Sequence, residues 1–167
     1  MFRKIIKKFT NSFLSESAEE KQKRINLTKE HFRKGQICRD EKDFKNAVLH
    51  FEEAIRLDPE DWLAYDEIAY WLADKLNEPE RGLNYAKKAM ELVPRKITNN
   101  YIAILDTIGW CHFNLGQFEK AKKYFEEAIK LQDFSDSFWV LRIYHLLAVY
   151  EKTENFQGAK ELYKKIE

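Results

Sequence analysis

One helical segment recurs along this chain, and its repetition restricts the fold more than any other feature of the sequence. The three clearest copies are AVLHFEEAIRLDP at 47–59, GLNYAKKAMELVP at 82–94 and AKKYFEEAIKLQD at 121–133. Each copy begins with a small residue, has a Phe or Ala four positions later, and has an alanine three positions after that. A weaker fourth copy contains Ala159, Tyr163 and Ile166. Because self-similarity at a fixed period indicates a repeat architecture, we expect a stack of similar units.

A second helical segment precedes each copy, so the repeating unit is a pair of helices. The positions that mark this segment are Gly35, Ala69, Gly109 and Leu147, which precede the small residue of the copy by 12, 13, 12 and 12 residues. Small residues on both helices let two backbones approach closely, and a large ring then fills the space beside them. We therefore expect the rings of Phe51, Phe125 and Tyr163 in the core.

The composition agrees with an all-α chain. The 167 residues include only five glycines and three prolines, with 34% charged and 44% hydrophobic residues. These proportions argue against turn-rich β folds and against disordered, low-complexity chains. Pro59 and Pro94 are the last residues of two of the copies and are expected to end those helices.

The repeating positions resemble the tetratricopeptide repeat, whose pattern is W-x2-L-G-x2-Y, then A-x3-F, then P. In this chain the repeats span about 28–61, 62–97, 102–135 and 140–167. The resemblance implies an all-α, right-handed superhelix of antiparallel helix pairs, with three repeats and a partial or divergent fourth. Residues 17–167 would form this repeat domain.

The resemblance also implies a concave groove, lined by the first helices of successive repeats, that binds a partner peptide or helix. The groove positions that combine carboxylates with aromatic rings are Asp66, Tyr70, Asp74, Asp106, Trp110, Phe113, Asn114 and Tyr144. Rings supply contact area and cation–π attraction while carboxylates pair with cations, so a partner with basic and apolar residues is expected. The alternative is that Tyr70 and Trp110 pack between repeats and that the aspartates are merely solvated.

One subtype of the family clamps the acidic C-terminal tails of heat-shock chaperones with Lys, Asn and Arg residues on the first helices. Phe32 and Gln36 occupy the first two of those positions here. Acidic residues, Asp66, Glu67 and Asp106, occur where later clamp residues would lie. A clamp of this kind is therefore not expected.

The first 16 residues form a separate basic, amphipathic segment with a hinge. Residues 1–14 contain four basic residues and no acid, so a net charge of +1 for the chain leaves −3 for the remainder. The helical spacing separates apolar and basic side chains on opposite faces, and these residues are Phe2, Arg3, Lys4, Ile5, Ile6, Lys7, Lys8, Phe9 and Phe13. Such a segment can contact an anionic membrane surface, dock on another protein, or occupy the groove of its own or a neighbouring copy. After it, Ser17 and Glu20 have the spacing of a helix-capping box.

The sequence contains no phosphate-binding loop, nucleophile motif or set of metal ligands at a recognised spacing. We therefore expect a binding protein rather than an enzyme, with no cofactor and no metal. The near balance of charge argues against nucleic acid as a partner. Two widely spaced cysteines, Cys38 and Cys111, suit a reducing compartment, so the expected location is the cytoplasm, with peripheral membrane contact through the first segment. Self-association through the N-terminal segment or the C-terminal helix is a further alternative.

Overall fold

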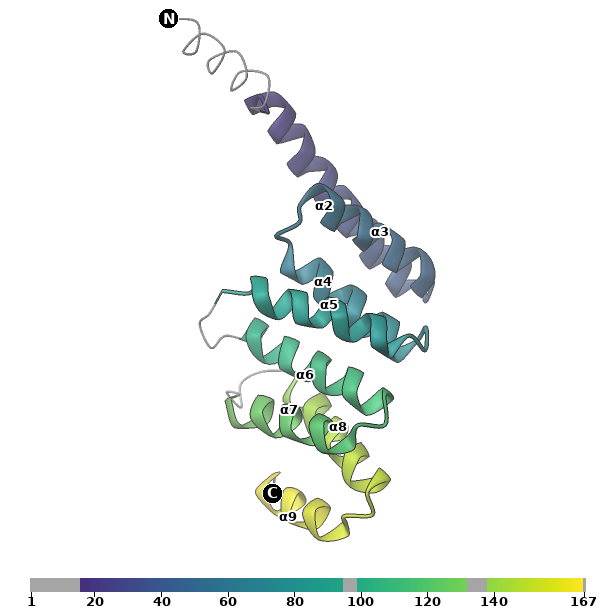
Figure 1. Ribbon diagram of the computed structural model, residues 1–167, viewed down its shortest axis with the longest axis vertical. Coiled ribbons are helices and arrows are strands. Elements are labelled where there is room, and N and C mark those ends of the chain that lie inside the picture. The colour runs from purple at the N-terminus through teal and green to yellow at the C-terminus, as the bar shows by residue number, and fades with distance from the viewer. Residues whose placement is uncertain (1–15, 95–98, 132–137, 167) are drawn as a thin grey trace, which may run out of the picture.

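The computed structural model describes residues 16–94, 99–131 and 138–166, which form helices only. The helices are α2 (Ala18–Asp40), α3 (Phe44–Leu57), α4 (Trp62–Asp74), α5 (Pro79–Leu92), α6 (Asn99–Asn114), α7 (Phe118–Leu131), α8 (Trp139–Lys152) and α9 (Phe156–Ile166). Within these ranges they make four antiparallel pairs that stack along the long axis of the molecule, from α2 at one end to α9 at the other (Figure 1). The predicted all-α fold of helix pairs is confirmed.

The close approach that the small residues predict is present in the first and third pairs. A Cβ atom on Gly35 would lie 2.7 Å from the ring of Phe51, and one on Gly109 would lie 2.6 Å from the ring of Phe125. Both rings are fully buried. Glycine is required at these two positions because any side chain would overlap a ring that closes the space between the two helices.

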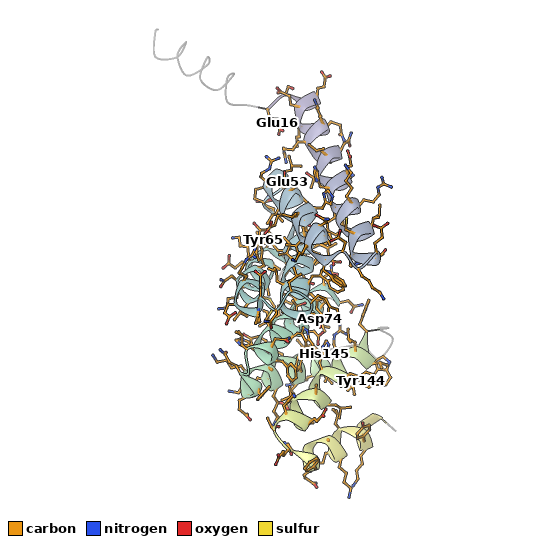
Figure 2. All side chains as sticks on the ribbon, turned by 90° about the vertical axis from the view of Figure 1, so that its right-hand side faces the viewer. Glu16, Glu53, Tyr65, Asp74, Tyr144 and His145 are labelled. Atoms are coloured by element: carbon orange, nitrogen blue, oxygen red, sulfur yellow. The ribbon has the colours of Figure 1, made fainter. Side chains whose placement is uncertain are left out.

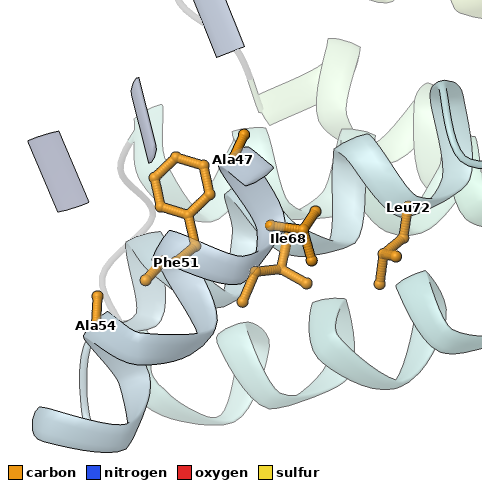
Figure 3. Packing of buried hydrophobic residues seen from close by; sticks show 7 residues of the cluster. Ala47, Phe51, Ala54, Ile68 and Leu72 are labelled. Carbon is orange, nitrogen blue, oxygen red and sulfur yellow. The ribbon is translucent and has the colours of Figure 1, made fainter. Parts of the chain in front are cut away.

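Successive pairs share one core, as a repeat stack requires. Figure 3 shows Ala47, Phe51 and Ala54 of α3 beside Ile68 and Leu72 of α4. These five side chains are buried and belong to one hydrophobic cluster. Because this cluster joins the first pair to the second, neither pair buries its apolar face alone.

The prediction that Tyr163 belongs to the core is wrong. Its side chain is 57% exposed, although it has the register of Phe51 and Phe125. The fourth pair has Leu147 at the small position, where the first and third pairs have glycine. Helix α9 packs instead through Leu162, which is buried against α8.

The capping box at the start of α2 is confirmed. The Ser17 hydroxyl accepts a hydrogen bond from the backbone N–H of Glu20, whose carboxylate accepts one from the N–H of Ser17. Arg24 then donates to the carbonyl oxygen of Leu57 at 2.9 Å, which ties the early turns of α2 to the end of α3. Residues 1–15, including every residue of the predicted membrane or docking segment, lie outside the described ranges.

Candidate functional site

The first helices of the four pairs share a pocket of about 590 Å³, which we call the central pocket. The face that carries it, the first-helix face, consists of α2, α4, α6 and α8. The lining residues are Arg39, Asp40, Lys42, Phe44, Asp66, Glu67, Tyr70, Trp71, Lys75, Ala103, Asp106, Thr107, Phe138, Leu141 and Arg142. Figure 2 shows two labelled residues of this face, Asp74 of α4 and Tyr144 of α8, on one side of the stack and Glu53 of α3 on the other.

The central pocket brings together three of the eight residues proposed from sequence, Asp66, Tyr70 and Asp106. The other five are absent from its lining. Four of those lie further along the helices and are linked to one another, and these are Asp74, Trp110, Phe113 and Asn114. The last, Tyr144, is 64% exposed on α8.

Trp110 packs between the third and fourth repeats. Its ring stacks on Phe113 with 4.9 Å between centroids and on His145 with 4.4 Å. Its indole N–H donates to Asp74 Oδ1 at 3.1 Å, and its carbonyl oxygen accepts from the Asn114 amide at 2.9 Å. These contacts agree with the alternative stated from the sequence, in which Trp110 packs between repeats.

Asp106 is buried and paired, so its charge is not free on the surface. It is 7% exposed, and both of its oxygens contact Nδ1 of His145, at 3.0 and 3.1 Å. His145 is itself buried between the rings of Trp110 and Phe125. This contact joins α6 to α8 and fixes one wall of the central pocket.

Asp66 has a different environment, because its Oδ1 atom is buried and has no hydrogen-bond partner among the described residues. Burial raises the pKa of this carboxyl to about 7, with further increases from the negative charges of Glu67 and Asp106. A hydrogen bond with Thr107 opposes the shift. Asp66 is therefore close to half protonated at neutral pH.

Glu67, next to Asp66, is fully engaged. One oxygen accepts from Arg39 at 3.0 Å, and the other accepts from the indole N–H of Trp71 at 2.8 Å. The Tyr70 ring meets the Trp71 ring edge-on at 4.9 Å, and the pKa of Tyr70 is raised to about 12 by burial and by the nearby carboxylates Asp74 and Asp106. The phenol is therefore a neutral hydrogen-bonding group throughout the physiological range.

Several pocket residues were absent from the set chosen by sequence, chiefly the basic Arg39, Lys42, Lys75 and Arg142. His145 was also missed. A signal for it exists, because Asp106 lies three residues before the small position of its repeat and His145 lies two residues before that of the next. The same offsets relate Asp66 to Thr107, which are hydrogen-bonded. The residue three before the small position of one repeat therefore faces the residue two before the small position of the following repeat.

The two cysteines and the histidines near them, His31 and His112, have packing roles. The Cys111 side chain is fully buried, and burial raises the pKa of its thiol to about 12, so the nucleophilic thiolate is scarce at neutral pH. His112 Nδ1 donates a hydrogen bond to Gln117 Oε1 at 2.9 Å, and the His112 ring stacks on Tyr124. His31 contacts His50 instead of Cys38. Across the described ranges, no three His, Cys, Asp or Glu side chains cluster as metal ligands would.

None of the helices in the described part of the chain is both long enough and apolar enough to cross a membrane.

Comparison with known proteins identifies the repeats. Residues 28–61 and 102–134 match the tetratricopeptide repeat family. The chain is 33% identical over 97 residues to Protein STIP1 homolog of Dictyostelium discoideum. That match covers 58% of this chain and 16% of the relative, so the chain spans a small part of the relative's length.

Solved structures share the fold at low sequence identity. The Sgt2 TPR domain from Aspergillus fumigatus superposes with a TM-score of 0.64 at 16% identity, covering 78% of this chain and 82% of that one. MamA (residues 41 to the end) from Desulfovibrio magneticus RS-1 superposes with a TM-score of 0.68 at 17% identity. The match covers 83% of this chain and 73% of that one. At these identities the likeness establishes the architecture.

Proposed function

Because this chain is a tetratricopeptide repeat protein, we propose that it acts as a scaffold or adaptor that holds a partner segment in the central pocket. Domains of this family are typical modules for protein–protein interaction. The observation that carries the proposal is the pocket itself, which is open to a ligand and shared by all four first helices. A site built across four repeats suits an extended segment or a helix.

The walls of the central pocket suit a segment with apolar and basic side chains. Tyr70 is half-buried and Leu141 is 38% exposed, so both offer apolar area to a ligand. Asp66, Glu67 and Asp106 bring carboxylates beside this area. The two free cysteines suit a reducing compartment such as the cytoplasm.

Truncating the apolar wall should weaken partner binding without unfolding the protein. Peptides selected from a displayed library on the full chain are expected to be enriched in Lys or Arg beside apolar residues. The double substitution Tyr70→Ala and Leu141→Ala should reduce their affinity about tenfold or more, since each side chain offers contact area at the centre of the site. Fluorescence anisotropy measures the affinity.

The matched control replaces one leucine and one tyrosine that are exposed elsewhere, Leu49→Ala and Tyr163→Ala. It should leave peptide affinity unchanged. Equal loss in the two double variants, or selected peptides without basic residues, would contradict the assignment of the site.

The basic segment 1–14 carries a second proposal, recruitment to an anionic membrane surface. Its four basic residues and its Phe and Ile residues have the chemistry of an interfacial anchor. In liposome flotation, the full chain should rise with vesicles that contain anionic lipid, and a chain lacking residues 1–14 should not. Equal flotation of both chains would refute the anchor, and a mass that grows with concentration in sedimentation would point to the alternative of self-association.

A further inference from the structure

Most carboxylates near the central pocket have polar partners for their oxygens, and Asp66 is the exception. Glu67, Asp74 and Asp106 each contact a cation, an indole N–H or an imidazole. Asp66 lines the pocket with a buried Oδ1 atom that has no hydrogen-bond partner among the described residues. A buried carboxylate oxygen in that state is costly to the fold, and groups of this kind are concentrated at sites of function.

The surroundings of Asp66 favour a cation that comes from outside the chain. The charged and titratable groups around it are Arg39, Glu67, Tyr70, Asp106, Cys111 and Arg142. Among them, Glu67 and Asp106 destabilise its ionised form by charge repulsion. Arg39 is already shared between Asp40 and Glu67. A bound ammonium group would offset both the burial of Asp66 and this repulsion.

We propose that Asp66 anchors one lysine side chain of the partner segment, with the aliphatic stem against Tyr70 and Leu141 and the ammonium group on Oδ1. This inference rests on the proposed function, because it names the contact that the central pocket makes. A single oxygen without a hydrogen-bond partner suits the point charge of lysine better than the bidentate fork of arginine. The pocket volume of about 590 Å³ leaves room for such a stem together with its neighbours in the segment.

The anchor makes binding depend on pH in a defined direction. Only ionised Asp66 pairs with an ammonium group, and its pKa in the free protein is about 7. Affinity should therefore rise as the pH rises from 6 to 8, by about tenfold, and level off above that range. Lysine stays charged across this interval, so the ligand does not contribute to the change.

The test uses short peptides, N-acetylated and C-amidated, with one central residue between Leu and Phe, measured on the full chain by fluorescence anisotropy. The central residue is lysine, norleucine or glutamate. At pH 8 the lysine peptide should bind about tenfold more tightly than the norleucine peptide, and the glutamate peptide should bind least. Asp66→Asn should abolish both the lysine preference and the pH dependence, while Asp40→Asn, which removes an exposed charge from the pocket rim, should keep both.

The outcomes separate the anchor from the wider function. If the lysine and norleucine peptides bind equally, and both are lost in the Tyr70→Ala and Leu141→Ala double variant, the pocket binds peptides but the anchor is refuted. If no peptide binds at millimolar concentration, both proposals fail. Spermidine binding as tightly as the lysine peptide would overturn the assignment to a peptide. The pH profile of the unmodified chain needs no substitution, so the test holds even if Asp66→Asn misfolds.

Discussion

Replacing Phe125 with alanine is expected to lower the free energy of unfolding by about 4 kcal/mol. The ring is fully buried and fills the space opened by Gly109, where a Cβ atom would lie only 2.6 Å from it. Removal leaves a cavity between α6 and α7 that the rigid helix pair can close only in part. Urea denaturation followed by circular dichroism measures the loss.

The matched control is Tyr163→Ala, which removes an aromatic ring at the same register of the fourth repeat. Because Tyr163 is largely exposed, this change should cost less than about 0.5 kcal/mol. Similar losses for Phe125→Ala and Tyr163→Ala would contradict the described packing of α9.

Replacing Asp106 with alanine is expected to lower the free energy of unfolding by about 3 kcal/mol. The change leaves Nδ1 of His145 without its carboxylate partner in a buried site between α6 and α8. Asp106→Asn keeps an oxygen that can accept a hydrogen bond, so its cost should be about 1 kcal/mol.

The same denaturation experiment distinguishes the two variants by the ratio of their losses in free energy of unfolding. Asp106→Ala and Asp106→Asn with equal, small costs would show that the contact with His145 does not stabilise the stack. If the contact stabilises the stack, His145→Ala should cost less in the Asp106→Ala background than in the unmodified chain, because the shared contact is already lost.

Much of the fold could be predicted from the sequence, because packing between the helices of one repeat leaves a periodic record. Gly35 with Phe51, and Gly109 with Phe125, were identified by spacing and are in contact. The capping box at Ser17 was identified in the same way. The exception is Tyr163, whose register predicts burial although its side chain is 57% exposed.

The candidate site was less predictable, because it depends on contacts between repeats. The spacing placed Asp66, Tyr70 and Asp106 on one face, and the structure brings them into one pocket. The spacing did not show that Asp106 pairs with His145, because this contact depends on how one helix pair stacks on the next. The sequence could not name a partner for Asp66 either, because the partner that we propose belongs to another molecule.

The most direct test of the central claim is nuclear magnetic resonance on the isotope-labelled full chain, titrated with the lysine peptide at pH 8. Binding in the central pocket predicts that backbone amide shifts change around Asp66, Tyr70, Asp106 and Leu141, with little change on α3, α5 and α7. Shifts concentrated on those three helices, or no shifts at saturating peptide, would contradict the claim that this protein holds a partner on its first-helix face.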